Sequence, residues 1–418
     1  MSTVHGTRSP NGKPLLRVCK AGQSMIVSAG MTMSYAGACP GGGEGRGSDE
    51  YLFPTRITPS ATINQLNVRT SKAFRHGAWK DAFMKIISVF NNKGGVGKTT
   101  YIYHIAHLLE RKGKKVLLVD LDSQCNLSAY CLSDAELEKS WKPDRGNSIW
   151  NAIERVYSGL GDIRQRQPTK VTKRYAGGTY ENMYLIPGDV LLSSYEDRLG
   201  DTWSSARGGD PLSLRVQSAI YRYILWCAEA VEADVVLMDL GPNLGSLNRA
   251  VLAASDYFVV PVSPDLFSIR GTENLGSKLQ TWRAGWDQCN INGAAHGIDL
   301  PAGRPAFLGY VKQQHNIRAN ATGMTRGWNI FGEQIEGAVQ NNIVAKLDPL
   351  GQVFHWADGN FDLGGIPNLH SLIPYSQDAR KPIYDCTGAD GLTGAHISTA
   401  RNSVAHFAPI VDTLLAVI

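Results

Sequence analysis

The chain has 418 residues, of which 43% are hydrophobic and 19% charged, a composition that supports a packed core and excludes a wholly disordered chain. Its formal charge of +5 is concentrated at the start, because residues 1–83 contain ten Lys and Arg against four Asp and Glu, which leaves residues 84–418 near −1. This balance excludes a body that binds nucleic acid through bulk charge, so any DNA contact needs a local basic patch.

The spacing of the cysteines and the length of the apolar runs indicate in which cellular compartment the protein resides. Seven cysteines are scattered without a C-x-x-C pair, which argues against zinc, an iron–sulfur cluster and a disulfide framework. The sequence has no run of about 18 apolar residues, and its first residues lack the apolar core of a secretory signal. We expect a reduced, cytoplasmic protein with no membrane partner.

Residues 1–83 differ from the rest of the chain. They contain a loop-like, glycine-rich stretch from Gly37 to Gly47 and no sustained period of 2 or 3.6. We predict a disordered or weakly ordered extension over 1–83. Two interpretations stay open: the functional protein begins at Met84 within an overlong reading frame, or the extension is a basic tail that binds a partner.

Residues 93–100 read Lys-Gly-Gly-Val-Gly-Lys-Thr-Thr, after the short apolar run 86–90 and before a helical pattern. Strand, glycine loop and helix together are the setting of a phosphate-binding loop. Glycines let backbone N–H groups wrap a phosphate, and the helix adds the positive end of its dipole. The predicted nucleotide-binding residues are Lys93, Gly94, Gly95, Val96, Gly97, Lys98, Thr99 and Thr100.

Two residues of this loop carry a specific chemistry. Lys98 can neutralise the charge of the β- and γ-phosphates, and Thr99 can place its hydroxyl on Mg²⁺. The strict pattern has glycine where this chain has Asn92, and a second lysine, Lys93, follows at once. We therefore expect ATP and Mg²⁺ as cofactors.

From Met84 onward, apolar runs alternate with helical patterns. Ile102, Ile105, Ala106 and Leu109 repeat with helical spacing, and 116–119 is the continuous apolar run of a buried parallel strand. Further strands are predicted at 183–186, 235–238, 257–262, 306–311 and 369–373. Further helices are predicted at 148–157, 212–231, 244–254, 271–286, 327–340 and 398–416. The alternation predicts an α/β fold over 84–418, with a doubly wound, mostly parallel sheet flanked by helices.

Two stretches interrupt this pattern. Residues 133–182 are polar and include a basic segment, and residues 345–368 contain many Gly, Asp and Pro residues. We interpret both as insertions at the edges of the sheet.

Carboxylates stand where predicted strands end. Asp120 and Asp122 close the run 116–119, and Asp239 closes 235–238. Ligands of open α/β sheets bind at the carboxyl ends of the strands. Asp122 there can orient the water that attacks the γ-phosphate, Asp239 can hold Mg²⁺ through water, and Asp120 is a supporting metal candidate. The strand at 257–262 leads to a loop that we place near the base.

Together these motifs resemble the ParA/MinD family of deviant Walker A ATPases, closest to ParA-like partition ATPases. The match rests on five segments and covers most of 84–418. They are KGGVGKTT (93–100), DLDSQCN (120–126), VVLMDLGP (235–242), ASDYFVVPVSPD (254–265) and LIPYSQDARKPIYD (372–385).

The resemblance implies roles for matching residues. Lys93 would be the signature lysine that reaches the phosphates of a partner subunit in an ATP-dependent homodimer. Lys98, Lys93 and Asp122 would be the catalytic residues, with Thr99 and Asp239 at the metal. The family function is a switch in plasmid or chromosome partition or cargo positioning, with nonspecific DNA binding, a ParB-like or other stimulating partner, and association with the nucleoid.

This chain departs from the family pattern at two places. Ser123 stands where the family usually has Pro, and Leu240-Gly241-Pro242 stands where it usually has a Pro pair after the aspartate. One alternative is a nucleotide-switch signalling protein or a MinD-like membrane regulator without a DNA role. Another is a P-loop synthetase acting on a small carboxylate.

Two sequence features bear on these alternatives. The predicted helix 398–416 contains only Arg401 as a basic residue, which favours docking on the body over a membrane surface. The candidates for DNA contact are Arg318, Arg326, Arg380, Lys381 and Arg401.

Overall fold

The computed structural model describes residues 3–8, 14–20, 23–28, 34–36, 84–263, 265–315, 334–369 and 371–418. The chain divides into two compact units, with the boundary between Arg69 and Thr70. The second unit carries the predicted nucleotide site.

The first unit contains an antiparallel sheet of four strands in the order β1-β2-β3-β4. The strands are β1 (Thr3–Arg8), β2 (Pro14–Lys20), β3 (Gln23–Ser28) and β4 (Ser34–Ala36). We expected a disordered or weakly ordered extension here, and no strand was predicted. Val18, Ile26 and Val27 favour strands, but six or seven residues give too short an alternation to identify one. The other residues of 1–83 lie outside the described parts.

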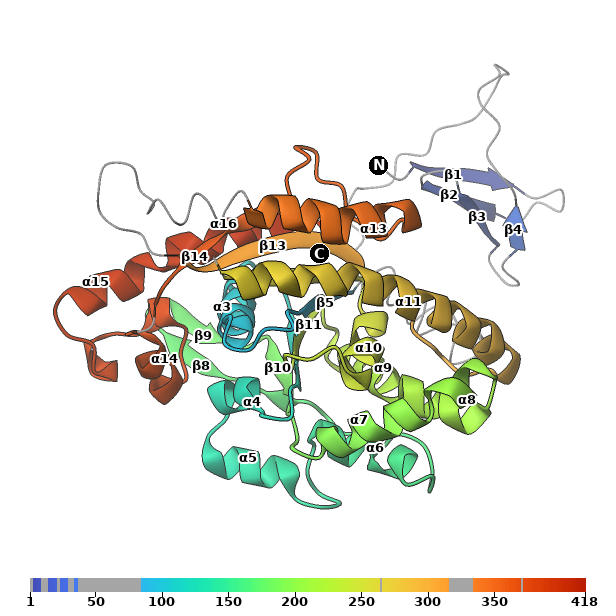
Figure 1. The fold of residues 1–418 in the computed structure, drawn as a ribbon, viewed down its shortest axis with the longest axis horizontal. Helices are drawn as coiled ribbons and strands as arrows, with labels where there is room; N and C mark the ends of the chain where they lie inside the picture. Colours follow the sequence, from blue (N-terminus) through green and yellow to red (C-terminus); the bar gives the residue numbers. More distant parts are fainter. Residues whose placement is uncertain are drawn as a thin grey trace. The chain divides into compact units, whose positions relative to one another are not determined.

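The second unit is built on an eight-stranded sheet in the order β14-β13-β12-β5-β11-β6-β10-β7 (Figure 1). All neighbours are parallel except β7, which runs antiparallel to β10. The strands are β5 (Lys85–Val89), β6 (Val116–Leu121), β7 (Thr169–Lys170), β10 (Met183–Ile186), β11 (Val235–Leu240), β12 (Tyr257–Val262), β13 (Ala306–His315) and β14 (Asp362–Pro367). This confirms the predicted α/β fold with a mostly parallel sheet.

Helices cover both faces of the sheet, which is why its central strands are continuously apolar. Along β5, Ile86 packs into one core and Ile87 and Val89 into the other. One face carries α3 (Lys98–Arg111), α4 (Asn126–Cys131), α5 (Asp134–Trp141), α14 (Ile373–Ala379), α15 (Ala395–Asn402) and α16 (Val404–Leu414). The other carries α6 (Ile149–Tyr157), α7 (Leu192–Asp201), α8 (Trp203–Arg207), α9 (Pro211–Val231), α10 (Ser246–Ala254), α11 (Leu266–His296) and α13 (Ala345–Leu347).

The strand predicted at 369–373 is wrong. The edge strand is β14, which lies inside the stretch 345–368 that we interpreted as an insertion. Gly364 has φ +132°, and a Cβ there would lie 3.1 Å from Cγ1 of Ile410 on α16. Since the close approach of α16 requires glycine in this strand, its sequence resembles a loop.

Two predicted helices have different limits. The segment 398–416 is broken at the buried Ser403 into α15 and α16, and α16 packs on the body as expected, with Phe407 and Ile410 fully buried. The helix predicted at 271–286 is the longer α11, because Asp265 accepts hydrogen bonds from the N–H groups of Phe267 and Ser268 and so caps an earlier start.

Two other predicted segments differ between the sequence prediction and the structure. Of the helix predicted at 327–340, residues 334–339 are helical and continue into a π-helical turn at Gln340–Val344, whereas 327–333 lie outside the described residues. The stretch 133–182 contains α5, α6, the edge strand β7 and a hairpin of β8 (Lys173–Tyr175) and β9 (Gly178–Tyr180).

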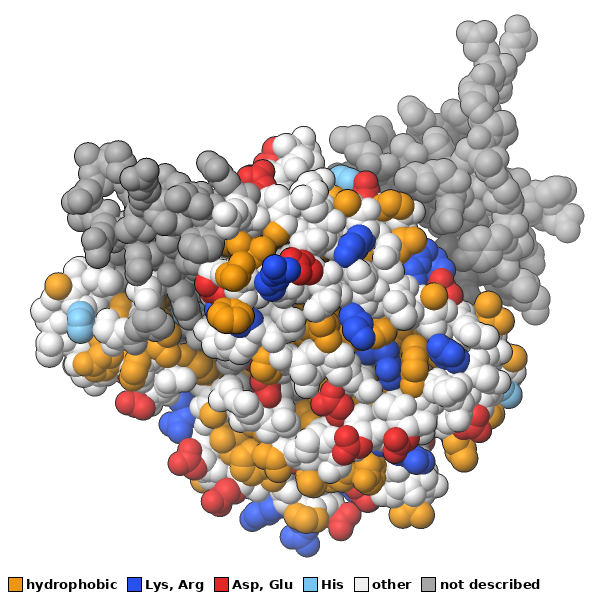
Figure 2. Space-filling model, viewed as in Figure 1, with side chains coloured by type: hydrophobic (Ala, Val, Ile, Leu, Met, Phe, Trp, Pro, Cys, Tyr) orange, Lys and Arg blue, Asp and Glu red, His pale blue; other side chains and the backbone are white. Residues whose placement is uncertain are grey.

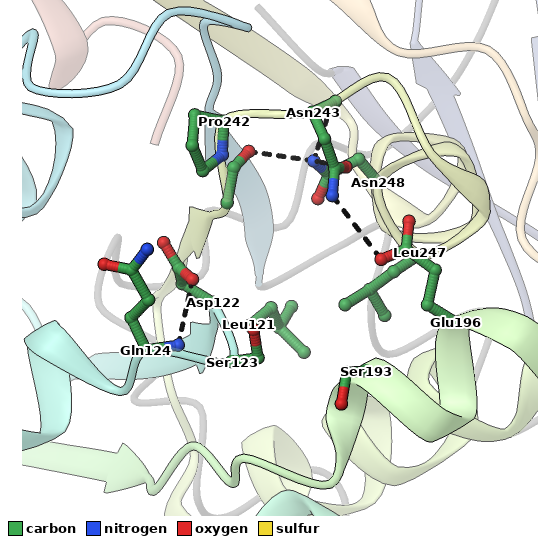
Figure 3. Close-up of a pocket in the computed structure, with 11 residues that line it drawn as sticks. Leu121, Asp122, Ser123, Gln124, Ser193, Glu196, Pro242, Asn243, Leu247 and Asn248 are labelled. Carbon is green, nitrogen blue, oxygen red and sulfur yellow. Dashed lines mark hydrogen bonds between the residues drawn. The ribbon is translucent and has the colours of Figure 1, made fainter.

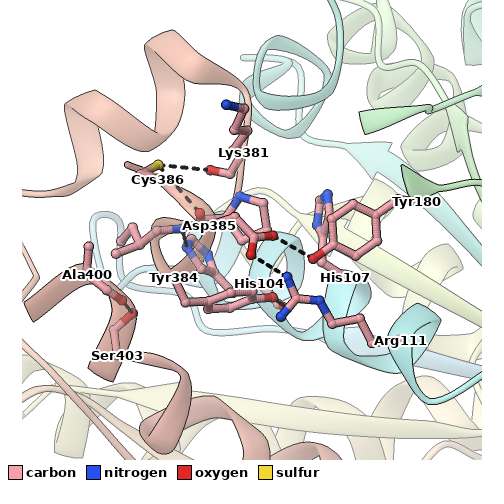
Figure 4. A network of polar contacts seen from close by, with 12 residues as sticks. His104, His107, Arg111, Tyr180, Lys381, Tyr384, Asp385, Cys386, Ala400 and Ser403 are labelled. Carbon is pink, nitrogen blue, oxygen red and sulfur yellow. Dashed lines mark hydrogen bonds and ion pairs between the residues drawn. The ribbon is translucent and has the colours of Figure 1, made fainter. Parts of the chain in front are cut away.

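A polar network ties the C-terminal segment to α3 (Figure 4). Arg111 forms an ion pair with Asp385, and Tyr180 donates a hydrogen bond of 2.6 Å to the other carboxylate oxygen. The Arg111 guanidinium also lies 4.3 Å from the centre of the Tyr175 ring. In the same region the backbone N–H of Ile383 donates to Nε2 of the buried His104 at 2.9 Å. These contacts hold the helix that follows the phosphate loop.

We expect Asp385→Ala to lower the free energy of unfolding by about 2–4 kcal/mol, because Arg111 and Tyr180 both lose a largely buried partner. The matched control is Asp412→Ala, which removes the ion pair to Lys112, the C-cap residue of α3, where both side chains are about half exposed. For this control variant, the free energy of unfolding should fall by only about 0.5 kcal/mol. Urea denaturation of both variants decides this, and equal losses would contradict the network's importance.

Candidate functional site

The loop between β5 and α3 has the backbone that a phosphate-binding loop needs. Gly95 and Gly97 have φ of 72° and 78°, a conformation that glycine adopts without strain. Gly97 is the N-cap of α3 and leaves the first N–H groups of the helix without a side-chain cap. Helix N-termini of this kind bind anions through their N–H groups and dipole.

The two lysines of the loop have different partners. Lys98 is 7% exposed and donates to the carbonyl oxygens of Asn91 and Lys93, each at 3.2 Å. Burial lowers its pKa, and the nearby carboxylates Asp239 and Asp122 partly offset that effect. Lys93 instead forms an ion pair with Asp265 at the start of α11, with both side chains about one-third exposed.

Two aspartates lie side by side beneath the loop. The register of β6 and β11 pairs Asp120 with Asp239, and both are buried. Burial and the Asp120 charge raise the pKa of Asp239 to about 8, and the Thr99 hydroxyl and Lys98 ammonium partly oppose this shift. A metal ion or another cation at this position would favour the ionised form.

The environment of Asp239 fits a hydrated magnesium ion. Neither of its carboxylate oxygens has a hydrogen-bond partner of normal geometry in the described part of the chain, although the residue is 1% exposed. Hard oxygen donors next to a threonine hydroxyl are what Mg²⁺ prefers. Asp239 and Thr99 are therefore the residues that would hold a magnesium ion, and their role at the metal stays a prediction.

Asp120 is already occupied by protein groups. Its Oδ2 accepts hydrogen bonds from the backbone N–H of Ser128 at 2.8 Å and from the Ser128 hydroxyl at 2.6 Å. Its Oδ1 accepts from the N–H of Asp122 at 3.3 Å. Burial raises its pKa to about 6, against the opposing effect of these hydrogen bonds. The geometry favours a positioning role for Asp120 over direct metal contact.

Asp122 lines a pocket of about 170 Å³ between the loops that follow β6 and β11 (Figure 3). One wall comes from Gly241 and Asn243 and another from Glu196 on α7. Asp122 accepts a hydrogen bond from the N–H of Gln124 at its Oδ1, at 3.0 Å. A carboxylate in this position can orient a water molecule.

Sequence reasoning missed the residues that hold these loops. Ser128 links Asp120 to the N–H of Gly188, and buried Asn248 donates to the carbonyl oxygens of Gly241 and Asn243 at 2.8 and 2.7 Å. Asn243 also reaches Glu196, with 3.4 Å between Nδ2 and Oε2. The contact of Ser128 with Gly188 joins positions 60 residues apart, and the contacts of Asn248 depend on the conformation of the loop between β11 and α10, which the sequence pattern does not define.

Of the three described residues that we singled out for DNA contact, two are already paired within the chain. Arg380 donates to the carbonyl oxygen of Leu132 at 2.8 Å, and Lys381 forms an ion pair with Asp390. Arg401 is exposed on α15, whereas Arg318 and Arg326 lie outside the described residues. Among the helices that the structure describes, we find none long and apolar enough to span a membrane.

We expect Asp239→Asn to stabilise the metal-free, nucleotide-free protein increasingly as pH rises. Its folded-state pKa is raised, so folded wild type keeps a proton that the unfolded chain has lost, and its stability falls as pH approaches 8. The stability difference between variant and wild type should grow by about 1–2 kcal/mol from pH 6.5 to 8 in chelator.

Thermal denaturation across this pH range checks the prediction. Glu138→Gln, at an exposed position on α5, is the control and should follow wild type. Parallel curves for wild type and Asp239→Asn would show that Asp239 is ionised throughout and sink the prediction.

Comparison with known proteins agrees with this site. A family model described as an AAA domain matches residues 84–288. The chromosome-partitioning ATPase Soj of Thermus thermophilus is 30% identical over 204 residues, which cover 49% of this chain and 65% of Soj. A putative replication protein A of Rhizobium rhizogenes is 33% identical over 212 residues, covering 47% of this chain and 48% of that protein. The chain thus spans less than two thirds of the length of these relatives.

A solved structure shows the same fold. The crystal structure of a protein from Corynebacterium diphtheriae aligns with a TM-score of 0.53 and 25% identity, covering 71% of this chain and 97% of its own. The matched region begins just before the phosphate loop and includes Asp122, Asp239 and Asp265. The motif geometry, the family model and the Soj relative show that about half of this chain is similar to P-loop ATPases of the ParA/Soj type.

Proposed function

We propose that this protein is a Mg²⁺-dependent ATPase whose ATP-bound form is a homodimer, acting as a switch in partition of a replicon or positioning of a cargo. The observation that carries the proposal is the buried Asp239 carboxylate, whose oxygens have no partner of normal geometry in the described chain and lie beside Thr99 and Lys98. The partition and positioning role comes from the Soj relative, which is described as a chromosome-partitioning ATPase.

The residues of the phosphate loop and its neighbours have different roles in binding and hydrolysing ATP. N–H groups of 94–100 and the Lys98 ammonium bind the phosphates, and Thr99 and Asp239 hold Mg²⁺, which when bound neutralises charge on the β- and γ-phosphates. Asp122 orients the attacking water from the wall of its pocket, and Asp120 keeps Asp122 in place through the hydrogen bond to its N–H. Hydrolysis by such positioning is slow without a stimulating partner.

Dimer formation involves Lys93. In its own chain this lysine is paired with Asp265, and both side chains are about one-third exposed, so the ion pair contributes little and can be exchanged. A second set of phosphates carries more charge than one carboxylate and would therefore attract Lys93 across a dimer interface. The exposed Leu266 and Phe267, next to Asp265 in the chain, provide apolar surface at this position.

DNA is the proposed nonspecific partner of the dimer. Figure 2 shows several Lys and Arg side chains on the face where α11 lies, with Asp and Glu side chains among and below them. Arg270 and Lys278 are exposed on that helix, and Arg270 forms an exposed ion pair with Glu273 that a phosphate can replace. A basic stripe of this kind binds phosphates without reading bases. A ParB-like or other partner would stimulate hydrolysis and reset the switch.

We predict that wild type sediments as a dimer with ATP and Mg²⁺ and as a monomer without them. Asp122→Ala should stay dimeric for longer, because the attacking water loses its orienting carboxylate, with hydrolysis about 100-fold slower. Lys93→Ala should not dimerise although it still binds ATP. Analytical ultracentrifugation together with phosphate release measures both effects.

Lys112→Ala, at the exposed end of α3, serves as the control and should behave like wild type. A monomer under every nucleotide condition would reject the sandwich dimer. ATP-dependent phosphorylation of a small carboxylate would instead favour the synthetase alternative.

We predict that the ATP-bound dimer binds duplex DNA and that the affinity falls as salt rises. Lys278→Glu should weaken binding about threefold to tenfold by removing a phosphate contact in each subunit, whereas Lys139→Glu on α5 should not. Fluorescence anisotropy at several salt concentrations tests this. A dimer that ignores DNA at low salt would favour the signalling alternative.

A further inference from the structure

A second carboxylate lines the pocket that contains Asp122. Glu196, a half-buried residue of α7, lies on the side of the pocket away from Asp122 (Figure 3). The loop between β11 and α10 forms a further wall through Gly241, Pro242 and Asn243. Hydrolysis as we propose it involves Asp122 and not Glu196, so the second carboxylate has another role, which its contacts indicate.

Both carboxylate oxygens of Glu196 lie against this loop. Oε2 is 3.4 Å from Nδ2 of Asn243. Oε1 occupies the space beside Gly245 that a side chain would need, because a Cβ added there would lie only 1.7 Å from it. Gly245 is the N-cap of α10 and provides no side-chain cap. The carboxylate thus brings negative charge to the start of this helix, where the helix dipole favours it.

The side chain of Asn243 is held from two directions. Nδ2 of the buried Asn248, on α10, donates to Oδ1 of Asn243 at 2.9 Å and to its carbonyl oxygen at 2.7 Å. Nδ2 of Asn243 in turn points to Glu196. The contacts therefore run from α10 through the loop to α7, and loss of the Glu196 carboxylate would release the loop on one side.

The loop that Glu196 holds contacts the groups that act on the terminal phosphate. A Cβ added to Gly241 would lie 3.5 Å from Cγ of Asp122. A Cβ added to Gly94 of the phosphate loop would lie 3.9 Å from Cγ of Pro242. Because reaction rates depend steeply on the alignment of the reacting atoms, a small displacement of this loop would slow hydrolysis.

We propose that Glu196 is a positioning residue for ATP hydrolysis, which holds the loop 241–245 so that Asp122 and its water stay aligned with the terminal phosphate. The inference rests on the proposed function, in which Asp122 orients that water. Glu196 acts through Asn243 and Gly245 and needs no contact with the nucleotide. It therefore affects the rate of hydrolysis, whereas the affinity for nucleotide depends on the phosphate loop.

The first test is Glu196→Ala. We expect kcat for ATP hydrolysis to fall about tenfold, with KM for ATP and the affinity for ADP within about twofold of wild type. Phosphate release gives the kinetic constants, titration calorimetry gives the ADP affinity, and thermal denaturation gives the stability. Asp197→Ala, at the next and exposed position of α7, is the matched control and should behave like wild type in all three measurements.

The second test is Gly245→Ala, which displaces the Glu196 carboxylate without removing it. Gly245 has φ −85°, a value that alanine adopts without strain, so the added Cβ acts on Glu196 and not on the backbone. We expect kcat to fall as in Glu196→Ala. The double variant should be no slower than Glu196→Ala alone, because both changes remove the same contact.

Three results would overturn the inference. The first is a wild-type kcat for Glu196→Ala, and the second is a double variant in which the two losses multiply. The third is a loss of ADP affinity and melting temperature that matches the loss of kcat, which would show that Glu196 only stabilises the fold. Wild type that hydrolyses no ATP would instead reject the proposed function itself.

Discussion

The structure depends on how two neighbouring buried carboxylates are balanced. Asp120 and Asp239 sit opposite each other on adjacent parallel strands, where two like charges with little solvent are unfavourable. The protein satisfies Asp120 with Ser128 and the N–H of Asp122, and it leaves both oxygens of Asp239 without such hydrogen bonds. The Lys98 ammonium is close enough to act on both Asp239 and Asp122. One carboxylate thus maintains the fold, while the other is the one that we propose for the metal ion.

The hydrogen bonds of Asp120 also link the site to the surrounding loops. Through its hydrogen bond to the Asp122 N–H, Asp120 sets the start of the loop after β6, and Asp122 packs near Gly241 in the loop after β11. In the loop after β11, the carbonyl oxygen of Gly241 accepts a hydrogen bond from the buried Asn248 side chain. Gly245 in the same loop lies so close to Glu196 on α7 that an added Cβ would collide with it. A change of charge at the terminal phosphate therefore acts on two loops that are packed against helices α7 and α10. This is a short physical route from nucleotide state to the surface.

The sequence predicted the parts of this site that depend on local pattern. The phosphate loop and strands β6, β10 and β11 were placed correctly, because strands buried on both faces read as continuous apolar runs. Strand β14 was missed because α16 lies so close that Gly364 must replace a strand former. The role of Ser128 was missed because it bonds to Gly188, 60 residues away, and that of Asn248 because its bonds depend on the conformation of the loop before α10. The pairing of Lys93 with Asp265 joins positions 172 residues apart and was equally invisible.

The segment that joins β12 to α11 holds the phosphate loop at two points. Asn91, just before the loop, donates to the carbonyl oxygen of Pro261 in β12, and Asp265 forms an ion pair with Lys93. These contacts fall within five residues of chain, so both act on one short piece of backbone. In the proposed dimer, release of Lys93 from Asp265 would free one of these two points and leave the other in place. Assembly would then act on the start of α11 through local geometry, without a long-range change in the sheet.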